Sequence, residues 1–403
     1  MKLHRNIALG IILGLEKTLI EKNSAANVIK KLLKSNPGWG SRDRRNIAKA
    51  FYDIIRQKRF FHTLSGSENE ALNLWNLLGG WMLLNDFPLP KWVEFNDLNI
   101  KEIKSKATIL AQDRKYKYSI PDWLDQIAVE AFGVEVWEKE IASLNTPSNM
   151  VIRVNTLVTS VHKLKDILQK KYNIITRTVP DSPHALVFKK NQSLQSIREY
   201  REGWFEVQDV NSQKISPWLK PESGKYYIDA CAGSGGKSLH LADMTKDSAK
   251  IMALDIYPPK LDELRKRCYR NNIESVQTRN VDDEEILKTI EPNADGVLID
   301  APCSGLGVLK RNPDAKWNTT PERLKAILET QERILQTYAP MVKNGGYLVY
   351  ATCSILPHEN RLQVDQFLNS QLGSQFEFEK EHTYFSHLTG FDGFYCARLI
   401  KKM

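Results

Sequence analysis

Residues 226–238 read Tyr226-Tyr227-Ile228-Asp229-Ala230-Cys231-Ala232-Gly233-Ser234-Gly235-Gly236-Lys237-Ser238. The stretch begins with an apolar run typical of a buried strand, turns at a cluster of glycines and opens a helix. Glycine lets a ligand approach the backbone closely, and a helix N-terminus favours negative charge. The spacing is not that of a P-loop, because Cys231 stands where that motif needs glycine, nor that of G-x-G-x-x-G, because Ser238 replaces the third glycine. The stretch therefore predicts a strand, a ligand-binding turn and a helix.

The same alternation of strand, turn and helix continues to the end of the chain from about residue 211. Helical patterns such as Pro259–Arg270 and Pro321–Tyr338 separate apolar runs that predict strands. The predicted strands are Tyr226–Ile228, Ile251–Leu254, Val276–Thr278, Gly296–Ile299 and Tyr347–Tyr350. Such alternation implies an α/β fold with a doubly wound parallel sheet. We expect Phe376–Glu379 and Gly393–Ile400 to close the sheet as a late hairpin.

At 403 residues the chain is long enough for two or three domains. Residues 1–120 space apolar residues three and four apart, which predicts a helical domain. Residues 121–210 mix helical stretches with two strand-like runs, Met150–Asn155 and His184–Phe188, and predict a small α+β domain. Residues 211–403 make up the predicted sheet domain.

The composition is that of an ordinary globular protein with an excess of positive charge. The chain has 57 Lys and Arg against 48 Asp and Glu, a net charge of +9, which indicates a polyanionic partner such as nucleic acid. The five cysteines show neither paired nor zinc-site spacing, so we expect free thiols, no metal and a reducing, cytoplasmic location. The apolar run Ile7–Leu15 is too short to span a bilayer, so we expect a core helix there and no membrane association. We also expect a monomer.

Two acidic residues follow the second and third predicted strands. Asp255 lies 22 residues after Gly233, where a carboxylate can accept both hydroxyls of a ribose. Asp282 follows the third strand, where a side chain can meet the edge of an adenine. Helix capping is the alternative for each. A glycine turn with such an acid is compatible with NAD as well as with S-adenosylmethionine, so these residues alone leave the cofactor open.

Two cysteines 50 residues apart favour methyl transfer. Cys303 lies in Asp300-Ala301-Pro302-Cys303-Ser304-Gly305, after the fourth predicted strand, and Cys353 lies in Tyr350-Ala351-Thr352-Cys353-Ser354, after the fifth. Because the carboxyl ends of parallel strands meet at one edge, both thiols are expected to face one crevice. A dehydrogenase has no evident use for such a pair. Methylation of carbon 5 of a pyrimidine does use a thiol, because a thiolate that adds to carbon 6 turns the ring into an enamine.

The three other cysteines, Cys231, Cys268 and Cys396, are interpreted as small buried hydrophobic residues, the usual alternative for a lone cysteine. The chemistry by itself does not decide which member of the pair is the nucleophile.

These motifs resemble those of the RNA (cytosine-5) methyltransferases of the RsmB/Sun family, over roughly residues 121–403. The resemblance rests on the glycine turn, the two cysteine motifs and three further ones: Arg153-Val154-Asn155, Gln208-Asp209-Val210-Asn211-Ser212-Gln213 and Asp392-Gly393-Phe394-Tyr395. Residues 1–120 are similar, more faintly, to the NusB-like RNA-binding domain of the bacterial small-subunit rRNA members. In one departure, Gly233-Ser234 replaces the Ala-Pro pair usual in the family's turn. The turn stays tight, so we expect cofactor binding to survive.

The resemblance implies a Rossmann-like, S-adenosylmethionine-dependent domain and a role for each matching residue. Cys353 resembles the nucleophile, Cys303 the second thiol implicated in product release, and Asp300 the acid near the cofactor and the target base. Asp255 and Asp282 resemble the ribose and adenine contacts. The residues that resemble the loop around the cofactor are Cys231, Ala232, Gly233, Ser234, Gly235, Gly236 and Lys237, the last of which can also reach the target base. The implied reaction is methylation of carbon 5 of a cytosine in RNA, with small-subunit rRNA as the expected substrate, through a covalent cysteine–cytosine intermediate.

Two basic clusters are candidates for RNA contact. The loop after Cys303 carries three basic residues and an aromatic one, which suit phosphates and a stacked base: Lys310, Arg311, Lys316 and Trp317. The alternative is a solvated loop with its tryptophan packed inward. The helical region carries the second cluster, Arg42, Arg44, Arg45, Arg56, Lys58 and Arg59. The alternative there is charge that only keeps a helix surface in solution.

Two other functions remain open. One is methylation of carbon 5 of a cytosine in tRNA. The other is a non-catalytic, RNA-binding ribosome assembly factor that kept the fold. Retention of both cysteines together with Asp300 and Lys237 argues against the second.

Overall fold

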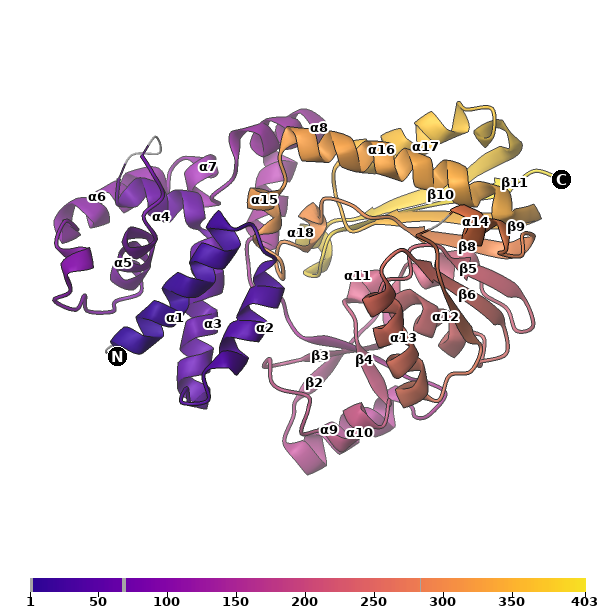
Figure 1. The fold of residues 1–403 in the computed structure, drawn as a ribbon, viewed down its shortest axis with the longest axis horizontal. Helices are drawn as coiled ribbons and strands as arrows, with labels where there is room; N and C mark the ends of the chain where they lie inside the picture. Colours follow the sequence, from indigo (N-terminus) through magenta and orange to yellow (C-terminus); the bar gives the residue numbers. More distant parts are fainter. Residues whose placement is uncertain (1–2, 67–69, 283) are drawn as a thin grey trace. The chain divides into compact units, whose positions relative to one another are not determined.

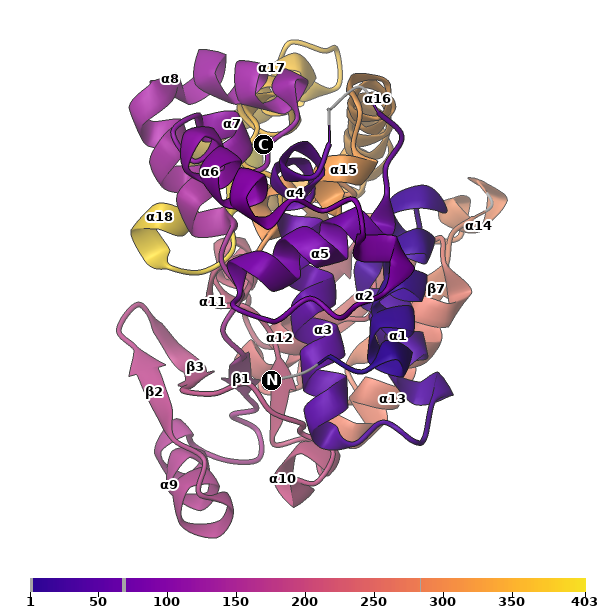
Figure 2. The same ribbon diagram turned by 90° about the vertical axis from the view of Figure 1, so that its left-hand side faces the viewer.

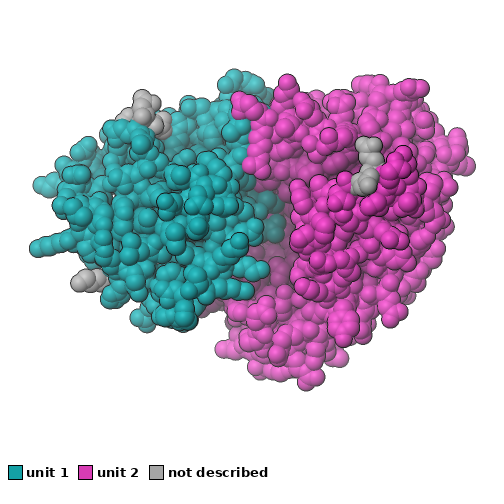
Figure 3. Space-filling view, viewed as in Figure 1, with its two compact units in different colours: residues 1–147, 308–321 teal, residues 148–307, 322–403 magenta. Residues whose placement is uncertain are grey.

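The computed structural model describes residues 3–66, 70–282 and 284–403. They form two compact units, shown in different colours in Figure 3. Unit 1 consists of Met1–Pro147 with Val308–Pro321, and unit 2 of Ser148–Gly307 with Glu322–Met403. The chain therefore leaves unit 2 after Gly307, contributes a short segment to unit 1 and then returns. Residues 121–147, which were expected in the α+β domain, pack within the helical unit.

Unit 1 is helical because its apolar residues recur every three or four positions and so form one face of each helix. α1 (Arg5–Leu15), α2 (Ala25–Ser35) and α3 (Ser41–Arg56) lie side by side in Figure 2, and their apolar faces form one core. The other helices of this unit are α4 (Lys58–Leu64), α5 (Leu74–Leu84), α6 (Ile100–Leu110), α7 (Arg114–Lys117), α8 (Asp122–Leu144) and α15 (Ala315–Asn318). In the part of the chain that the structure describes, no helix is long and apolar enough to cross a membrane.

Unit 2 contains a small antiparallel sheet with the strand order β2-β3-β1-β4. Its strands are β1 (Val151–Val154), β2 (Thr176–Val179), β3 (Ser182–Phe188) and β4 (Phe205–Val207). The strand-like runs around residues 151–154 and 184–188 are thus confirmed as β1 and β3, whereas β2 and β4 were not predicted. α9 (Val161–Tyr172) covers this sheet through the fully buried side chains of Leu164 and Leu168.

The larger sheet of unit 2 has the strand order β10-β11-β9-β8-β5-β6-β7. Its strands are β5 (Tyr226–Asp229), β6 (Lys250–Asp255), β7 (Val276–Asn280), β8 (Ala294–Asp300), β9 (Val342–Thr352), β10 (Phe376–Tyr384) and β11 (Phe394–Lys401). β5 to β9 pair in parallel, while β11 is antiparallel to both β9 and β10. The predicted doubly wound sheet and its closing hairpin are both confirmed.

Helices cover both faces of this sheet. α12 (Gly236–Met244) and α13 (Pro258–Asn271) lie on one side in Figure 1, and α16 (Pro321–Tyr338) and α17 (Arg361–Leu368) lie on the other. The short helices of unit 2 are α10 (Arg198–Arg201), α11 (Val210–Gln213), α14 (Glu284–Lys288) and α18 (Ser386–Thr389). Because β5, β6, β8 and β9 run in parallel, their carboxyl ends, and the residues that follow them, meet at one edge of the sheet.

Candidate active site

A cavity of about 380 Å³ lies at this carboxyl edge, within unit 2. Its walls come from the ends of β5, β6 and β8 and from the facing side of α16. The lining residues are Ala230, Cys231, Asp255, Ile256, Tyr257, Lys260, Leu287, Asp300, Pro302, Thr330, Arg333, Ile334, Thr337 and Tyr338. Three residues predicted to bind the cofactor, Cys231, Asp255 and Asp300, are therefore brought together. The contribution of α16 was missed, because a regular amphipathic helix carries no motif that marks which side faces a ligand.

The glycine turn after β5 is held in a conformation that its sequence makes possible. Gly233 has φ +56° and Gly235 has φ +86°, a region that other residues rarely adopt. A Cβ on Gly235 would lie 2.0 Å from a methyl carbon of Leu264, so a larger residue does not fit. Arg267 donates a hydrogen bond of 2.7 Å to the carbonyl oxygen of Ser234. This bond fixes the turn at Ser234.

Asp255 joins the glycine turn to the end of β6. Its Oδ2 accepts the backbone N–H of Gly233 at 2.8 Å, and its Oδ1 accepts the backbone N–H of Tyr257 at 2.9 Å. A carboxylate has about four acceptor positions, so two remain for hydroxyl groups in the cavity. Asp282 lies beyond the end of β7, is exposed and is not among the lining residues.

Lys237 and Asp300 form an ion pair between the first turn of α12 and the end of β8. The Lys237 side chain is nearly buried, and its ammonium also lies 5.5 Å from the centre of the Phe394 ring. Burial alone lowers the pKa of Lys237, but the Asp300 carboxylate outweighs it, so the pKa is raised. The lysine is therefore held charged next to the cavity.

The two predicted catalytic thiols meet. The Sγ atoms of Cys303 and Cys353 are 3.1 Å apart, within hydrogen-bonding distance for sulfur. The register explains this: β8 and β9 are neighbours, with Asp300 opposite Ala351, so the cysteines follow at nearly the same level. The hydrogen bond with Cys353, together with burial, raises the pKa of Cys303 well above its ordinary value. Cys303 is therefore held as a neutral thiol.

Glu359 is a further residue of this site that the sequence motifs did not single out. It ends the single 3₁₀ turn Pro357–Glu359 that follows Cys353, and its side chain is fully buried. Its carboxylate accepts hydrogen bonds from Ser304 and Ser354, the residues directly after the two cysteines. In the sequence, Glu359 is recognisable only as an acidic residue six positions after Cys353. The fold shows that it also binds Ser304, in the motif of the other cysteine.

The segment after Gly307 corrects part of the predicted RNA surface. Lys316 is fully buried in unit 1, where its ammonium donates hydrogen bonds to the carbonyl oxygens of Arg56 and Tyr118 and to the side-chain oxygen of Asn145. The prediction that Lys316 faces RNA is therefore wrong, because a buried ammonium needs internal acceptors and here has three.

Other members of the two basic clusters also have structural roles within unit 1. Trp317 donates its indole N–H to the carbonyl oxygen of Ile55 at 2.7 Å and packs on the helical core, which is the inward alternative considered above. Lys310 is largely buried as well, with its ammonium 2.9 Å from the Thr146 hydroxyl. Arg44 donates to the carbonyl oxygens of Asn36 and Trp39 and so braces the loop before α3.

Arg56, a further member of the second cluster, is buried and donates a hydrogen bond of 2.9 Å to the carbonyl oxygen of Lys310, while Lys58 and Arg59 are half-buried. Three members of the two clusters lie at the surface. Arg311, Arg42 and Arg45 are exposed, the last two at the start of α3. These three residues stay candidates for RNA contact.

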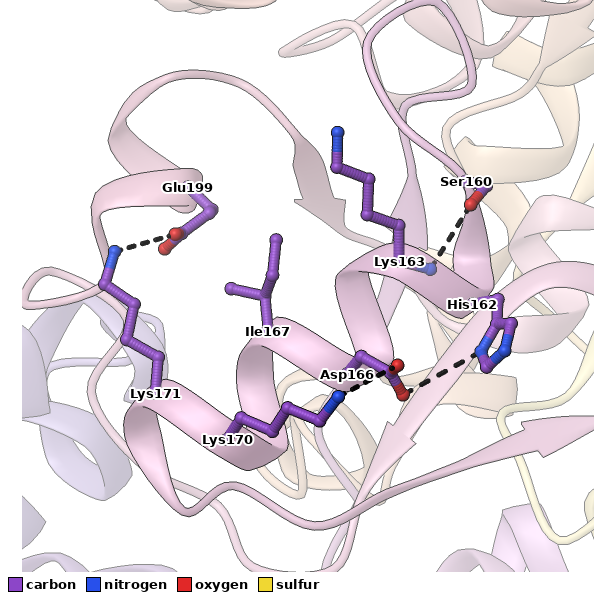
Figure 4. A pocket seen from close by; sticks show the side chains of 8 residues that line it. All are labelled: Ser160, His162, Lys163, Asp166, Ile167, Lys170, Lys171 and Glu199. Atoms are coloured by element: carbon purple, nitrogen blue, oxygen red, sulfur yellow. Dashed lines mark hydrogen bonds and ion pairs between the residues drawn. The ribbon is translucent and has the colours of Figure 1, made fainter.

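A second hollow lies on the small sheet's helix α9, away from the predicted site residues (Figure 4). Its charged side chains pair with one another: Asp166 lies 3.6 Å from the ammonium of Lys170, and Glu199 lies 2.9 Å from that of Lys171. This hollow contains none of the catalytic or cofactor-binding residues predicted from the sequence.

Known protein families match both parts of unit 2. Residues 216–400 match the family described as 16S rRNA methyltransferase RsmB/F, and residues 120–195 match the ferredoxin-like domain of RsmF/B-like methyltransferases. The second match corresponds to the region of α8 and the small antiparallel sheet.

Several individual proteins are similar over much of the chain. The ribosomal RNA small subunit methyltransferase B of Pasteurella multocida is 32% identical over 317 residues, which cover 74% of this chain and 69% of the relative. A Synechocystis protein named "Probable ribosomal RNA small subunit methyltransferase B" is 34% identical over 254 residues, and the chain spans 57% of its length.

Solved structures share the fold. The crystal structure of PH0851 covers all of both chains with a TM-score of 0.82 and 23% identity. That of NSun6 from Pyrococcus horikoshii, determined with SFG, covers 70% of this chain and 98% of its own with a TM-score of 0.64 and 21% identity. From the matched family and the extent of the Pasteurella multocida similarity, we conclude that the chain belongs to the RsmB/F family of 16S rRNA methyltransferases.

Proposed function

We propose that this protein transfers a methyl group from S-adenosylmethionine to carbon 5 of a cytosine in small-subunit rRNA. In this proposal Cys353 is the nucleophile and Cys303 is the second thiol. The observation that carries the proposal is the 3.1 Å approach of the two sulfur atoms, one of which directly follows Pro302 in the lining of a cavity shared with Asp255 and Asp300. One base placed between the strand ends could touch both thiols.

The cavity fits the proposed cofactor. Asp255 keeps two acceptor positions for the ribose hydroxyls, and the turn after β5 contributes Ala230 and Cys231 to the cavity lining. Apolar side chains such as Ile256, Leu287 and Ile334 offer a surface for a flat base. SFG, an analogue of S-adenosylmethionine, accompanies the similarly folded NSun6 structure, which is consistent with this assignment.

The thiol chemistry divides into two steps that the two cysteines serve separately. The Cys353 thiolate adds to carbon 6, which forms a sulfur–carbon bond and shifts the ring electrons to carbon 5. S-adenosylmethionine supplies the methyl group that carbon 5 accepts, and S-adenosylhomocysteine leaves. Carbon 5 then gives up its proton to a base or to water, and the sulfur–carbon bond breaks to return the thiolate. We assign assistance in this second step to Cys303.

The contact between the two sulfur atoms lets one thiol act on the other. Since the pKa of Cys303 is raised, its S–H is available to donate a hydrogen bond to the sulfur of Cys353. A hydrogen bond to the charged form stabilises a thiolate. The positive charge of Lys237 lies in the same site.

For the substrate, we infer RNA contacts from the parts of the chain that precede the large sheet. The exposed Arg42 and Arg45 at the start of α3 suit phosphate groups, and the relatives named above act, by their names, on small-subunit rRNA. We keep residues 1–120 and 121–210 as the proposed RNA-facing regions.

The proposal is tested by methyl transfer to defined RNA. The purified protein is incubated with radiolabelled S-adenosylmethionine and, separately, small-subunit rRNA, small ribosomal subunits or tRNA, and the products are sequenced after bisulfite treatment. We expect a new 5-methylcytosine at one site in small-subunit rRNA. Label in tRNA alone would favour the alternative substrate, and label at an exocyclic amine would reject the thiol mechanism.

A further inference from the structure

Glu359 connects the two cysteine-bearing turns. Ser304, which follows Cys303, donates both its backbone N–H, at 2.7 Å, and its hydroxyl, at 2.6 Å, to the carboxylate. Ser354, which follows Cys353, donates its hydroxyl to the same oxygen that accepts the Ser304 hydroxyl. Both turns are thus anchored on one side chain from a third segment of unit 2.

Gln331 adds a further link. Its side-chain amide donates to Glu359 at 3.3 Å and to the carbonyl oxygen of Pro302 at 3.0 Å, and the residue is fully buried in α16. The turn that carries Cys303 is therefore held on both sides of the cysteine, at Pro302 and at Ser304. The Glu359 backbone is itself fixed, since its carbonyl oxygen accepts the Tyr350 hydroxyl at 2.7 Å.

The chemistry of these contacts requires a carboxylate. Four neutral N–H and O–H donors point at its two oxygens, and an ionised carboxyl group is acceptor-only. A glutamine of the same shape would replace one oxygen by an NH₂ group, so either the N–H donors of Ser304 and Gln331 lose their acceptor or both serine hydroxyls have to turn to accept. A buried charge is costly unless its acceptor positions are used, and here the two serines that follow the cysteines supply three of the four donors and Gln331 supplies the fourth.

We propose that Glu359 is the positioning residue that sets the separation and alignment of the two thiols, by holding the turn behind each cysteine on one carboxylate. This inference rests on the proposed function, in which Cys303 and Cys353 act on the same base. Neither sulfur touches Glu359 in the contacts described above, so its positioning effect passes through Ser304 and Ser354, while its charge also contributes to the raised pKa of Cys303. A displacement of about 1 Å in a reacting group can cost about 100-fold in rate.

The main test compares Glu359→Gln with a matched control, Asp295→Asn. Asp295 is also a carboxylate in unit 2 that accepts a backbone N–H, from Tyr226 at 2.9 Å, but it lies near the start of β8, at the other edge of the sheet. We expect Glu359→Gln to lower kcat by about 100-fold with an unchanged KM for S-adenosylmethionine, because Glu359 does not line the cofactor cavity. Asp295→Asn should lower the melting temperature without changing kcat.

A second readout does not depend on RNA. The labelling rate of each cysteine by iodoacetamide is followed by mass spectrometry in the protein without substrate. Glu359→Gln should change the rates of both Cys303 and Cys353, whereas Asp295→Asn should leave both at the wild-type value. Wild-type kcat and labelling rates in Glu359→Gln would overturn the proposal, as would equal losses in the control.

The two serines give a side-specific test that removes only one donor at a time. We expect Ser354→Ala to slow formation of the protein–RNA adduct and Ser304→Ala to slow its release. Identical effects of the two variants on both steps would reject the positioning role even if Glu359→Gln does not fold. If Cys353→Ala still transfers methyl groups, the proposed function fails, while the labelling rates still decide whether Glu359 positions the thiols.

Discussion

Asp229, at the end of β5, carries a buried carboxyl group whose ionisation should make stability depend on pH. Burial raises its pKa to about 6, although Ser238 donates a hydrogen bond of 2.6 Å to it and its Oδ1 has no partner in the described structure. The folded protein thus binds a proton that the unfolded chain, with a pKa near 4, has already lost. This contribution to stability is fully present below pH 4 and is lost as the pH rises through 6.

We therefore expect the wild type to lose about 3 kcal/mol of unfolding free energy between pH 4 and 7 relative to Asp229→Asn, whose side chain does not titrate. Urea unfolding of both proteins across this range measures the difference. Parallel pH profiles for the two proteins would show that Asp229 ionises normally in the fold.

A substitution of Asp255 tests the proposed binding of S-adenosylmethionine. Removal of its carboxylate deletes the proposed ribose acceptor and the acceptor for the Gly233 N–H. Calorimetry with S-adenosylmethionine or S-adenosylhomocysteine should show binding weakened by roughly 10- to 100-fold in Asp255→Ala. Asp181→Ala provides the comparison, because that residue is exposed in the turn between β2 and β3 and has no proposed cofactor contact. Equal or tighter binding of NAD by the wild type would contradict the assignment.

At the scale of the element, the strands of the large sheet were predictable and the segment around α15 was not. The runs at residues 226–228, 251–254 and 296–299 are continuous and apolar because those strands are buried on both faces. Together with the run at residues 347–350, they predict that Asp255, Cys303 and Cys353 lie at one edge of the sheet. β4 was missed because three residues carry too little periodicity.

The burial of Lys316 could not be predicted from the sequence, and the reason differs from that for β4. Its amino-acid type indicates an exposed loop, and only the distant partners supplied by Arg56, Tyr118 and Asn145 allow it to be buried. The role of Glu359 could not be predicted for the same reason. Its partners Ser304 and Gln331 are distant in the sequence, and Ser354 carries no signal of its own beside Cys353. In both cases the decisive contacts are tertiary.

The burial of Lys316 leads to a prediction for the segment as a whole. Lys316→Met keeps most of the side-chain volume but leaves three internal acceptors without a donor, so we expect the unfolding free energy to fall by about 3 kcal/mol. Burial also lowers the pKa of Lys316 well below its ordinary value, so the cost of keeping it charged offsets part of this loss. Urea unfolding compares Lys316→Met with the control Lys104→Met, which replaces an exposed lysine of α6. Unchanged stability in Lys316→Met would mean that the segment is not anchored by this residue.

At the scale of the whole molecule, the net charge of +9 bears on RNA binding. RNA affinity should fall steeply with salt, with each phosphate contact adding about 0.7 to 0.9 to the log–log slope. If Arg42 and Arg45 contact phosphates, their double replacement by alanine should reduce the slope by about 1.4 to 1.8. The control replaces Lys266 and Lys288, two exposed lysines on α13 and α14, outside the proposed RNA-facing regions. Equal slopes for the wild type and the arginine variant would remove α3 from the RNA surface.

The most direct test of the account concerns the division of labour between the two thiols. Wild type, Cys303→Ala and Cys353→Ala are each incubated with labelled RNA and S-adenosylmethionine and run on a denaturing gel. The account predicts that Cys303→Ala accumulates a protein–RNA adduct that survives denaturation, because attack proceeds and release is impaired. Cys353→Ala should form no adduct and transfer no methyl group. An adduct with Cys353→Ala and none with Cys303→Ala would contradict the assignment of roles, and full activity in both variants would contradict thiol catalysis itself.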